Sequence, residues 1–565
     1  MEARAAAKKG MLVYVPSINW RPSHSQELLD RLEDDGWQVH IFEHNKRTYS
    51  LYRAEDLVQK LCVHMRAWSG ENHGDDRPGN IVMVGHSLGG LLVRDALMSD
   101  DDDASIAQRG MLPGATPWTD RVSRVVLIAS PNAGYDFHSE PWFRKWLYVL
   151  ASLFGQFMVE QFEMGSPYMT ELRLRWYKYM VRRSGDDNNR SRRAIRLVQV
   201  FGDEDRLVSS RANEVDPTVL TNAAVITIPG ASHGNIIKLK SADSHDRYEL
   251  LYNAVNGDFR NMAIPATPEA QEPVVFILHG ARSSSYGNWV SGSARLLKNP
   301  APGHDRTWMK ATIVTESYGY FGIFNFVNPW IRRRNARRLL LSYGEKFITH
   351  NPNNMYFLGH SNGTYMLGRC LEKVPSMRFR RIYLAATVLP KEYEWKKIFA
   401  RQQVGHFSSG KWVNGDVHCD RGRHDVPVGW LCSILHGLTK DIGTGGFEGF
   451  LESPQGLKEH NYGYAGGHSS MLLPKVSAGE RSAATERRLT EIAAFIRHGH
   501  DHTEPTSGPP NVLFALASRV LGEVSQPWSL AFLVVIALSI SSGAAWYLPV
   551  VLASVYAVVT LARAA

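Results

Sequence analysis

The chain has 565 residues, more than one hydrophobic core usually serves, so two or more domains are expected. Apolar residues make up 44% and charged residues 21% of the sequence, which excludes a largely disordered chain. The net charge of +9 would suit an anionic surface, but no nucleic-acid motif accompanies the basic clusters 182–196 and 332–338, so no nucleic-acid partner is expected.

The N-terminal segment differs from a secretion signal. Residues 1–10 are rich in Ala, Lys and Arg and run into only five apolar residues, 11–15, before Pro16. Four widely spaced cysteines form no CxxC pair and no metal-ligand pattern, which is typical of a reducing compartment. We therefore expect the folded part to be cytosolic and to hold no metal.

Two long segments of the chain repeat one plan. Each opens with a strand-like apolar run, 11–15 in the first and 274–278 in the second. Each later has a β-rich run that ends in Gly-His-Ser, within 81–90 and 355–364, followed by a helical segment and another buried strand. Strands that alternate with helices predict a parallel sheet covered on both faces.

Three serines lie in the pattern Gly-x-Ser-x-Gly: Ser87, Ser232 and Ser361. Ser87 and Ser361 each follow an apolar strand and precede a helix, as in a nucleophile elbow, where a sharp turn exposes the hydroxyl oxygen. Ser232 adjoins His233, which is better placed as the base, so we interpret it as a chance match.

Each of the two elbow serines is followed by an acid and a histidine after further strands. Asp205 lies in GDED and His233 in the turn GASHG; in the second segment Asp425 lies in GRHD and His468 in YAGGHSS. A serine hydroxyl needs such a base, held by an acid, to become a nucleophile.

Alternatives remain open for these roles. Neighbouring acids, Asp203 and Asp420, could replace the named ones, and the remote histidines could be structural. The histidines beside the serines, His86 and His360, are interpreted as packing residues of the elbows.

These motifs resemble the α/β-hydrolase superfamily over about 490 residues. The resemblance implies the fold class α/β, with two tandem α/β-hydrolase domains of mostly parallel strands covered by helices, and no cofactor. It also implies two catalytic triads: Ser87–Asp205–His233 and Ser361–Asp425–His468.

The resemblance further implies two oxyanion holes, each made of two backbone N–H groups. One donor follows the nucleophile, Leu88 or Asn362, and the other lies in the turn after the opening strand, Ile18 or Ala281. The second segment has the family's His-Gly in that turn (LHGA), whereas the first reads VPSI and lacks the glycine.

The first segment also resembles the lipase-type branch of the superfamily, in IASPNAGYDF and GSPYMTEL. The intervening insert, about 135–180, is predicted to form a lid that suits a long acyl chain. A helix that packs only on the sheet or on the second domain is the alternative. The apolar residues on which this prediction rests are Trp142, Trp146, Leu147, Leu150, Leu153, Phe154, Phe157 and Phe162.

Two Pro-rich linkers, 263–273 and 501–511, divide the chain into domains 1–262 and 274–500 and a tail, 512–565.

The tail is expected to anchor the protein in a membrane. From Val524 to Ala562 there are 39 positions without a charged residue. With a break at the Ser- and Gly-rich stretch 539–543, this run predicts a transmembrane helical hairpin of Pro527–Ser542 and Ala544–Ala562. Val512–Val524 is predicted to lie on the membrane surface. The alternatives are an interfacial hairpin or a helix pair buried in a soluble core.

The sequence therefore predicts a membrane-associated serine hydrolase with its catalytic domains on the cytosolic face, cleaving lipid or lipid-like carboxylic esters through an acyl-enzyme. The apolar tail would also offer a surface for oligomerisation. An acyltransferase, thioesterase or amidase could use the same triad, because a fold does not define a reaction. One of the two domains could instead be a non-catalytic scaffold or ligand-binding module.

Overall fold

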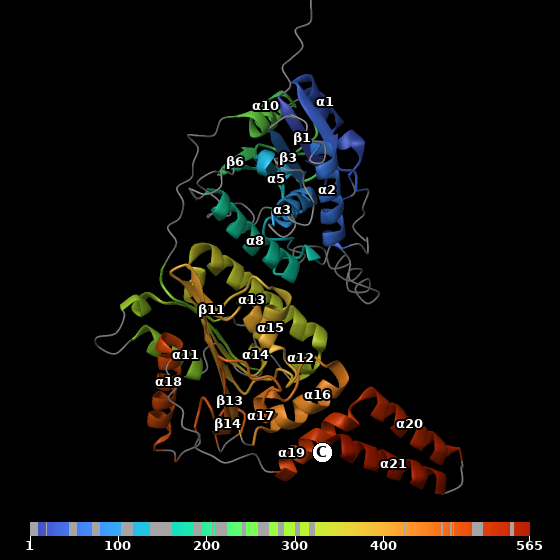
Figure 1. Ribbon diagram of the computed structural model, residues 1–565, viewed down its shortest axis with the longest axis vertical. Helices are drawn as coiled ribbons and strands as arrows, with labels where there is room; N and C mark the ends of the chain where they lie inside the picture. The colour runs from blue at the N-terminus through green and yellow to red at the C-terminus, as the bar shows by residue number, and fades with distance from the viewer. Residues whose placement is uncertain are drawn as a thin grey trace, which may run out of the picture. The chain divides into compact units, whose positions relative to one another are not determined.

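The chain forms two compact units, Met1–Glu269 and Ala270–Ala565, in a computed structural model (Figure 1). The structure describes residues 9–18, 20–44, 53–70, 80–102, 117–135, 161–184, 194–205, 208, 223–239, 244–257, 271–280, 288–299, 306–315, 323–422, 424–464, 467–474, 477, 479–499, 512–542 and 547–564.

A sheet of six parallel strands forms the centre of the first unit, in the order β2-β1-β3-β4-β5-β6. The middle strands are almost continuously apolar because helices cover both faces of the sheet. The predicted parallel α/β architecture is thus confirmed for this unit. The strands are β1 (Gly10–Val15), β2 (Trp37–Ile41), β3 (Ile81–His86), β4 (Val122–Ile128), β5 (Arg196–Gly202) and β6 (Ala223–Ile228).

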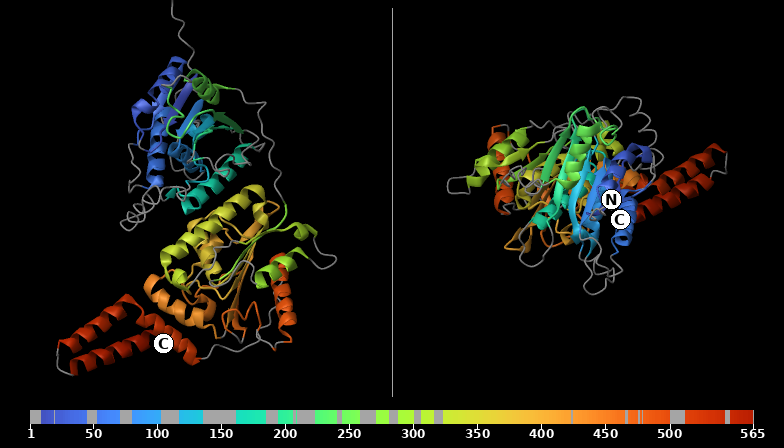
Figure 2. Two further views of the ribbon diagram at one scale, coloured as in Figure 1. Left: turned by 180° about the vertical axis from the view of Figure 1, so that it is seen from behind. Right: turned by 90° about the horizontal axis from the view of Figure 1, so that it is seen from above.

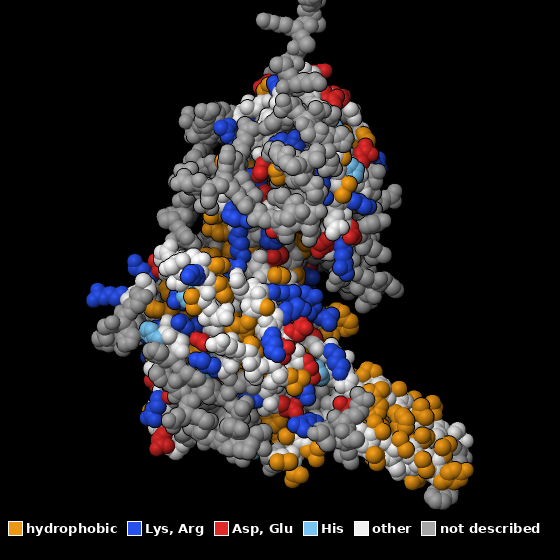
Figure 3. Space-filling view, in the orientation of Figure 1, with side chains coloured by type: hydrophobic (Ala, Val, Ile, Leu, Met, Phe, Trp, Pro, Cys, Tyr) orange, Lys and Arg blue, Asp and Glu red, His pale blue; other side chains and the backbone are white. Residues whose placement is uncertain are grey.

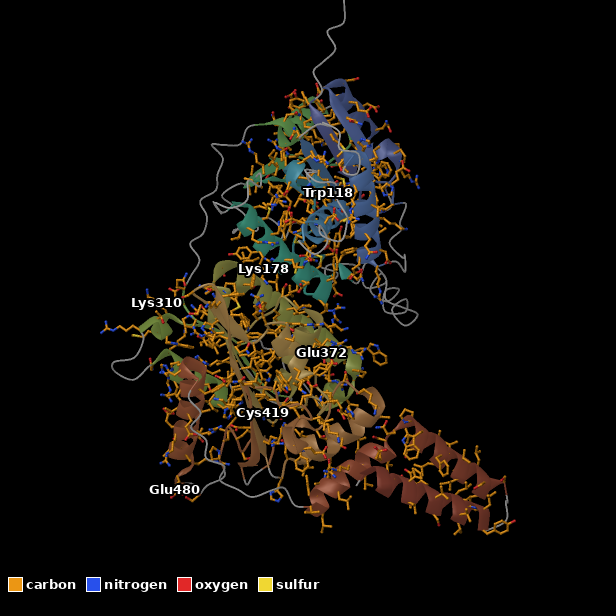
Figure 4. All side chains as sticks on the ribbon, in the orientation of Figure 1. Trp118, Lys178, Lys310, Glu372, Cys419 and Glu480 are labelled. Atoms are coloured by element: carbon orange, nitrogen blue, oxygen red, sulfur yellow. The ribbon has the colours of Figure 1, made fainter. Side chains whose placement is uncertain are left out.

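Alternate residues of β1 point into two separate apolar cores, one on each face of the sheet. Met11, Val13 and Val15 pack against α2 (Ala54–Ser69), α3 (Leu88–Asp100) and α8 (Pro167–Ser184). Leu12 and Tyr14 pack against α1 (Gln26–Asp34) and α10 (Ser244–Asn256). The described residues of the unit also form the short elements η1 (Pro22–His24) and α5 (Trp118–Arg121); Trp118, labelled in Figure 4, is fully buried.

The described part of the predicted lid belongs to the core of the first unit. Phe162 and Trp176 are buried in the same apolar cluster as α3. On α8, Tyr168 donates a hydrogen bond of 2.8 Å to Asp95 of α3, and Arg175 donates one of 3.0 Å to the same carboxylate. From residue 161 onward the insert therefore packs on the domain, as in the alternative interpretation; its apolar residues between 136 and 160 lie outside the described residues.

The second unit repeats the strand order of the first. Its six parallel strands lie in the order β14-β13-β10-β9-β7-β8, so that in chain order each strand takes the place of its counterpart in β1–β6. Two such parallel sheets fit the predicted tandem arrangement. The strands are β7 (Val274–Leu278), β8 (Thr312–Val314), β9 (Met355–His360), β10 (Arg381–Ala385), β13 (Asp416–Gly422) and β14 (Leu457–Tyr464), with a separate hairpin of β11 (Gly405–Ser408) and β12 (Lys411–Asn414).

Helices cover both faces of the second sheet, with α11 (Asn288–Lys298) and α18 (Arg481–His498) on one side and α13 (Pro329–Thr349) and α14 (Asn362–Lys373) on the other (Figures 1 and 2). Cys419 of β13, labelled in Figure 4, is buried between them. None of the four cysteines of the chain, all of which are described, forms a disulfide. The remaining elements are η4 (Arg306–Lys310), α12 (Ile323–Val327), η5 (Pro352–Asn354), α15 (Trp395–Ala400), the π-helical turn η6 (Pro427–Leu431), α16 (Cys432–Thr439) and α17 (Gly445–Glu448).

The tail forms three helices, α19 (Val512–Val524), α20 (Pro527–Ser541) and α21 (Tyr547–Ala564). Helices α20 and α21 lie side by side, joined by a 2.5 Å hydrogen bond between Ser529 and Tyr556, and apolar side chains cover their surface (Figure 3). Within the described residues no single helix has the length and apolarity to cross a membrane, whereas α19 and α20 together, bent by 73°, meet that requirement. A helical hairpin is thus present near the predicted position, but its insertion into a membrane stays a prediction.

Helix α19 packs on the second unit beside η6. The ring of Phe514 stacks on Trp430 with 5.0 Å between centroids and meets the edge of Phe447. Ser433 donates a 2.6 Å hydrogen bond to the carbonyl of Ser518, and the Ser518 hydroxyl donates to the carbonyl of Gly429. One face of the helix predicted to lie on the membrane surface is therefore occupied by protein.

Candidate active site

Both elbow serines have a strained backbone. Ser87 follows β3 with φ 55°, and Ser361 follows β9 with φ 53°, a left-handed conformation that costs a non-glycine residue about 1–3 kcal/mol. A backbone hydrogen bond from each serine to the neighbouring strand holds it there, 2.8 Å to Ile128 and 3.0 Å to Ala385. The helices α3 and α14 begin at the next residue, as the elbow prediction requires.

Close packing explains the second glycine of each elbow. A Cβ on Gly89 would lie 1.9 Å from the carbonyl oxygen of Val15, and one on Gly363 would lie 2.6 Å from that of Leu278. Any side chain would therefore push the helix away from the neighbouring strand. The Gly-x-Ser-x-Gly spacing follows from this contact between α3 and β1, or α14 and β7.

The first site joins the three predicted residues in one hydrogen-bonded chain. Ser87 Oγ lies 2.9 Å from His233 Nε2, and His233 Nδ1 lies 2.9 Å from Asp205 Oδ2. Asp205 is buried after β5 and accepts a further bond of 3.2 Å from the backbone N–H of Val208. The alternative acid, Asp203, is exposed.

The bonding pattern sets the tautomer of His233. With Asp205 as a carboxylate, Nδ1 carries the proton and donates it to Oδ2, so Nε2 presents a lone pair. That lone pair can only accept from Ser87, whose hydroxyl then donates its proton to the ring. This is the resting arrangement of a serine nucleophile and its base.

Tyr135 is a member of the first site that the sequence analysis did not identify. Its hydroxyl lies 2.6 Å from Ser87 Oγ. Burial raises the pKa of Tyr135 to about 12, although the hydrogen bond with Ser87 lowers it. The signal lies in IASPNAGYDF, where the Pro-x-x-Gly turn after β4 delivers the next residue to the serine, but no spacing rule identifies that residue as functional.

The second site holds its acid and histidine in the same way. His468 Nδ1 lies 2.9 and 3.0 Å from the two oxygens of Asp425, and the backbone N–H of Val428 donates to Asp425 at 3.0 Å. Between the described side chains of Ser361 and His468, however, there is no hydrogen bond. The second site has the more complete motifs in sequence, yet the structure links all three members only in the first.

The alternative acid of the second unit belongs to another network. Asp420 accepts from His418 at 3.0 Å and also bonds Tyr383 and Arg488. Burial alone would raise the pKa of Asp420, but the neighbouring His418 and Arg488 hold it well below its ordinary value. Asp420 therefore joins Arg488 of α18 to the sheet, separately from the Asp425–His468 pair.

The histidines beside the nucleophiles are poor bases. Burial, with repulsion from His233, lowers the pKa of His86 to about 3, and burial with repulsion from His468 lowers that of His360 to about 3. His360 instead bonds the carbonyl of His468 at 3.0 Å through Nε2. Both rings agree with the packing role that the sequence predicts for them.

The turns predicted to complete the oxyanion holes differ between the units. The strand registers pair Val15 with Gly85 and Leu278 with Gly359, so Ser17 and Gly280 are equivalent. A Cβ on Gly280 would lie 2.7 Å from Ser361 Cβ, which shows that this turn touches the nucleophile.

The predicted donors lie as follows. Leu88 and Asn362 are the buried first residues of α3 and α14, directly after the serines. Ile18 is half-buried and packs on the core of the first unit, and Ala281 lies outside the described residues. Among the residues that the structure describes, no group of three or more His, Cys, Asp or Glu could hold a metal ion.

The sequence of the first unit matches a known family. The model described as "Alpha/beta hydrolase family" matches residues 12–238, a range that includes β1 to β6, Ser87, Asp205 and His233. Over these residues the first unit is similar to that family. The three hydrogen-bonded residues follow β3, β5 and β6 of this unit. No curated protein matches the chain in sequence.

Solved structures with similarity to the chain include the phospholipase PlaB from Legionella pneumophila, which is 15% identical, with 45% of this chain and 61% of that chain covered and a TM-score of 0.32. A lipase-esterase related protein from Clostridium acetobutylicum is 12% identical over 44% of this chain and 95% of its own, with a TM-score of 0.27. The esterase Est2 from Thermogutta terrifontis is 14% identical over 45% and 84%, with a TM-score of 0.29. The chain thus spans less than two thirds of PlaB.

Proposed function

We propose that this protein is a serine hydrolase that cleaves carboxylic esters through an acyl-enzyme. The observation that supports it most is the chain Ser87–His233–Asp205, with two hydrogen bonds of 2.9 Å in a domain similar to the alpha/beta hydrolase family. A strained serine at the start of a helix, a histidine of defined tautomer and a buried acid together match the requirements of nucleophilic catalysis.

In the proposed reaction Ser87 Oγ attacks the acyl carbonyl carbon, and its proton passes to His233 Nε2. The carbonyl π electrons move to the oxygen, which the backbone N–H of Leu88 stabilises at the start of α3. Collapse of the intermediate breaks the bond to the alkoxy group, and His233 returns the proton to the leaving alcohol. Water then attacks the acyl-enzyme with His233 as base, which releases the acid and restores Ser87.

The second unit is proposed as a second hydrolase domain, with Ser361, His468 and Asp425 in the same roles. The repeated strand order, the φ of 53° at Ser361 and the close turn at Gly280 support this proposal. The missing bond between Ser361 and His468 favours the other candidate, a ligand-binding module without catalysis. Catalytic hydrogen bonds often form only with substrate bound, so both candidates remain for experiment.

The proposed substrates are lipids or lipid-like esters at the cytosolic face of a membrane. The support is the tail, where α20 and α21 expose large apolar side chains such as Leu538, Ile540 and Val558. In water, a continuous apolar surface of this size would be far more than soluble proteins usually tolerate. The charge-free run and the bent pair α19–α20 agree with membrane insertion.

The test measures ester hydrolysis by the full-length protein in detergent, with a short-chain p-nitrophenyl ester as substrate. We expect the Ser87→Ala, Ser361→Ala double variant to lose at least about 10³-fold in kcat/KM, as for other removed nucleophiles. Ser232→Ala is the matched control, because it removes the third serine of the same pattern; it should keep the wild-type rate.

The single variants decide between the candidates for the second unit. Activity that persists in Ser87→Ala and vanishes in the double variant would establish a second catalytic site. Activity that vanishes in Ser87→Ala alone would favour the binding module. A double variant as fast as the wild type would refute the proposed function, and a preference for a matched thioester or amide would move the reaction to that class.

A further inference from the structure

The first site lacks a feature that the second site has. In the second unit Gly280, in the turn after β7, lies so close to the nucleophile that a Cβ on it would be 2.7 Å from Ser361 Cβ. Its equivalent in the first unit, Ser17, carries a Cβ, so the turn after β1 cannot repeat this approach. The turn after β1 thus lacks the glycine that brings the second turn close to its serine, and Tyr135 is a further polar group beside Ser87.

Backbone hydrogen bonds hold Tyr135 beside Ser87. Its backbone N–H donates to the carbonyl of Phe162 at 2.8 Å, and its own carbonyl accepts from Met164 at 2.9 Å. The preceding Gly134 has φ 105°, and a Cβ there would lie 2.7 Å from the nitrogen of Met164. The turn and the pairing with residues 162–164 fix the ring, with its hydroxyl 2.6 Å from Ser87 Oγ.

The proton arrangement makes Tyr135 the donor in that contact. Ser87 has one hydroxyl proton, and His233 Nε2, which carries none, accepts it at 2.9 Å. Ser87 Oγ can therefore only accept from the tyrosine, so the Tyr135 O–H points at the oxygen that will attack.

From this geometry we infer that Tyr135 is a catalytic residue of the first site, whose hydroxyl donates to the oxyanion formed when Ser87 attacks the ester. As the bond between Oγ and the acyl carbon forms, Oγ loses basicity and its proton goes to His233. The oxyanion develops on the former carbonyl oxygen, which is bonded to the same carbon as Oγ. The Tyr135 O–H moves its hydrogen bond from Oγ to this oxygen and keeps its proton throughout. The inference rests on the proposed function of the first site.

The two sites would then stabilise the same charge by different means. Burial keeps the Tyr135 hydroxyl protonated through the physiological range, since its pKa lies at about 12, so it stays a neutral donor. In the second unit the position equivalent to Tyr135, six residues after Ala386, is Glu392, and the next residue, Tyr393, donates its hydroxyl to the carbonyl of Gly368 instead. There the close turn at Gly280 would serve instead.

Tyr135→Phe tests the inference in the Ser361→Ala protein, where only the first site can react. We expect kcat/KM for the p-nitrophenyl ester to fall about 10²-fold or more, mostly in kcat, as for a removed oxyanion donor. The affinity for a trifluoromethyl ketone, whose adduct carries the oxyanion, should fall by the same factor. The affinity for the product carboxylate, which has no such adduct, should change less than twofold.

A control variant and the activity of the parent protein distinguish failure of the inference from failure of the proposed function. Tyr168→Phe also removes a buried hydroxyl, one that bonds Asp95, and should leave both affinities unchanged. Rates are divided by the fraction of protein that fluorophosphonate titrates at Ser87, so that misfolded protein does not count. If the parent hydrolyses the ester and Tyr135→Phe matches it in kcat and ketone affinity, the inference is wrong. If the Ser361→Ala parent neither hydrolyses nor titrates, the proposed function of the first site fails and the inference with it.

Discussion

The position of an acid after its strand decides whether its carboxylate contacts the histidine of the site. Asp205 and Asp203 are two positions apart after β5, yet one is buried against His233 and the other is exposed. The backbone N–H of Val208 donates a hydrogen bond of 3.2 Å to Asp205 Oδ1 and helps to hold that carboxylate inward. The same bond from Val428 holds Asp425 in the second unit.

This geometry predicts opposite effects for two neighbouring substitutions. Asp205→Asn should lower kcat by about 10³–10⁴-fold, because an amide cannot hold His233 in the tautomer that accepts the serine proton. Asp203→Asn, the matched control, should change kcat less than twofold. Steady-state hydrolysis in the Ser361→Ala protein measures both. The reverse ranking would show that Asp203 is the functional acid.

At the scale of elements, the sequence predicts strands more securely than the partners of helices. Strands β3 and β9 are predictable because each is an apolar run that leads into Gly-His-Ser. The sequence predicts that helix α19 lies on the membrane surface, whereas one of its faces packs on the second unit. An amphipathic helix has the same pattern whether its apolar face meets lipid or protein. The docking of α19 depends on Phe514 meeting Trp430, which no local pattern reveals.

For the candidate site, too, the sequence predicts residues that follow strand ends and does not predict those whose position depends on contacts between distant segments. Ser87, Asp205 and His233 follow strand ends in a fixed order, so their convergence could be predicted. Tyr135 could not, because its position depends on pairing with residues 162–164, distant in sequence.

The docking of α19 predicts that two truncations of the tail will behave differently. A chain that ends after Gln526 keeps α19 and loses α20 and α21, so it should fold, leave the membrane and hydrolyse soluble esters at the wild-type rate. A chain that ends after His502 also loses Phe514, which should destabilise the second unit by about 1–3 kcal/mol. Carbonate extraction and thermal unfolding measure the two effects. A chain ending after Gln526 that stays in the membrane pellet would show that the anchor lies elsewhere.

In the whole molecule, two sheets of equal strand order carry two candidate sites that differ in their residues and hydrogen bonds. The first has a complete hydrogen-bonded chain and Tyr135. The second has the close glycine turn and an acid–histidine pair without a bond to Ser361. The central claim is that Ser87 is an activated nucleophile.

Labelling with a fluorophosphonate, followed by identification of the modified peptides, tests this claim most directly. We predict that the full-length protein is labelled at Ser87, that His233→Ala abolishes this labelling, and that Ser232 stays unmodified. Labelling at Ser361 that His468→Ala removes would extend the claim to the second unit. A folded protein in which Ser87 does not react, or reacts equally without His233, would contradict the account.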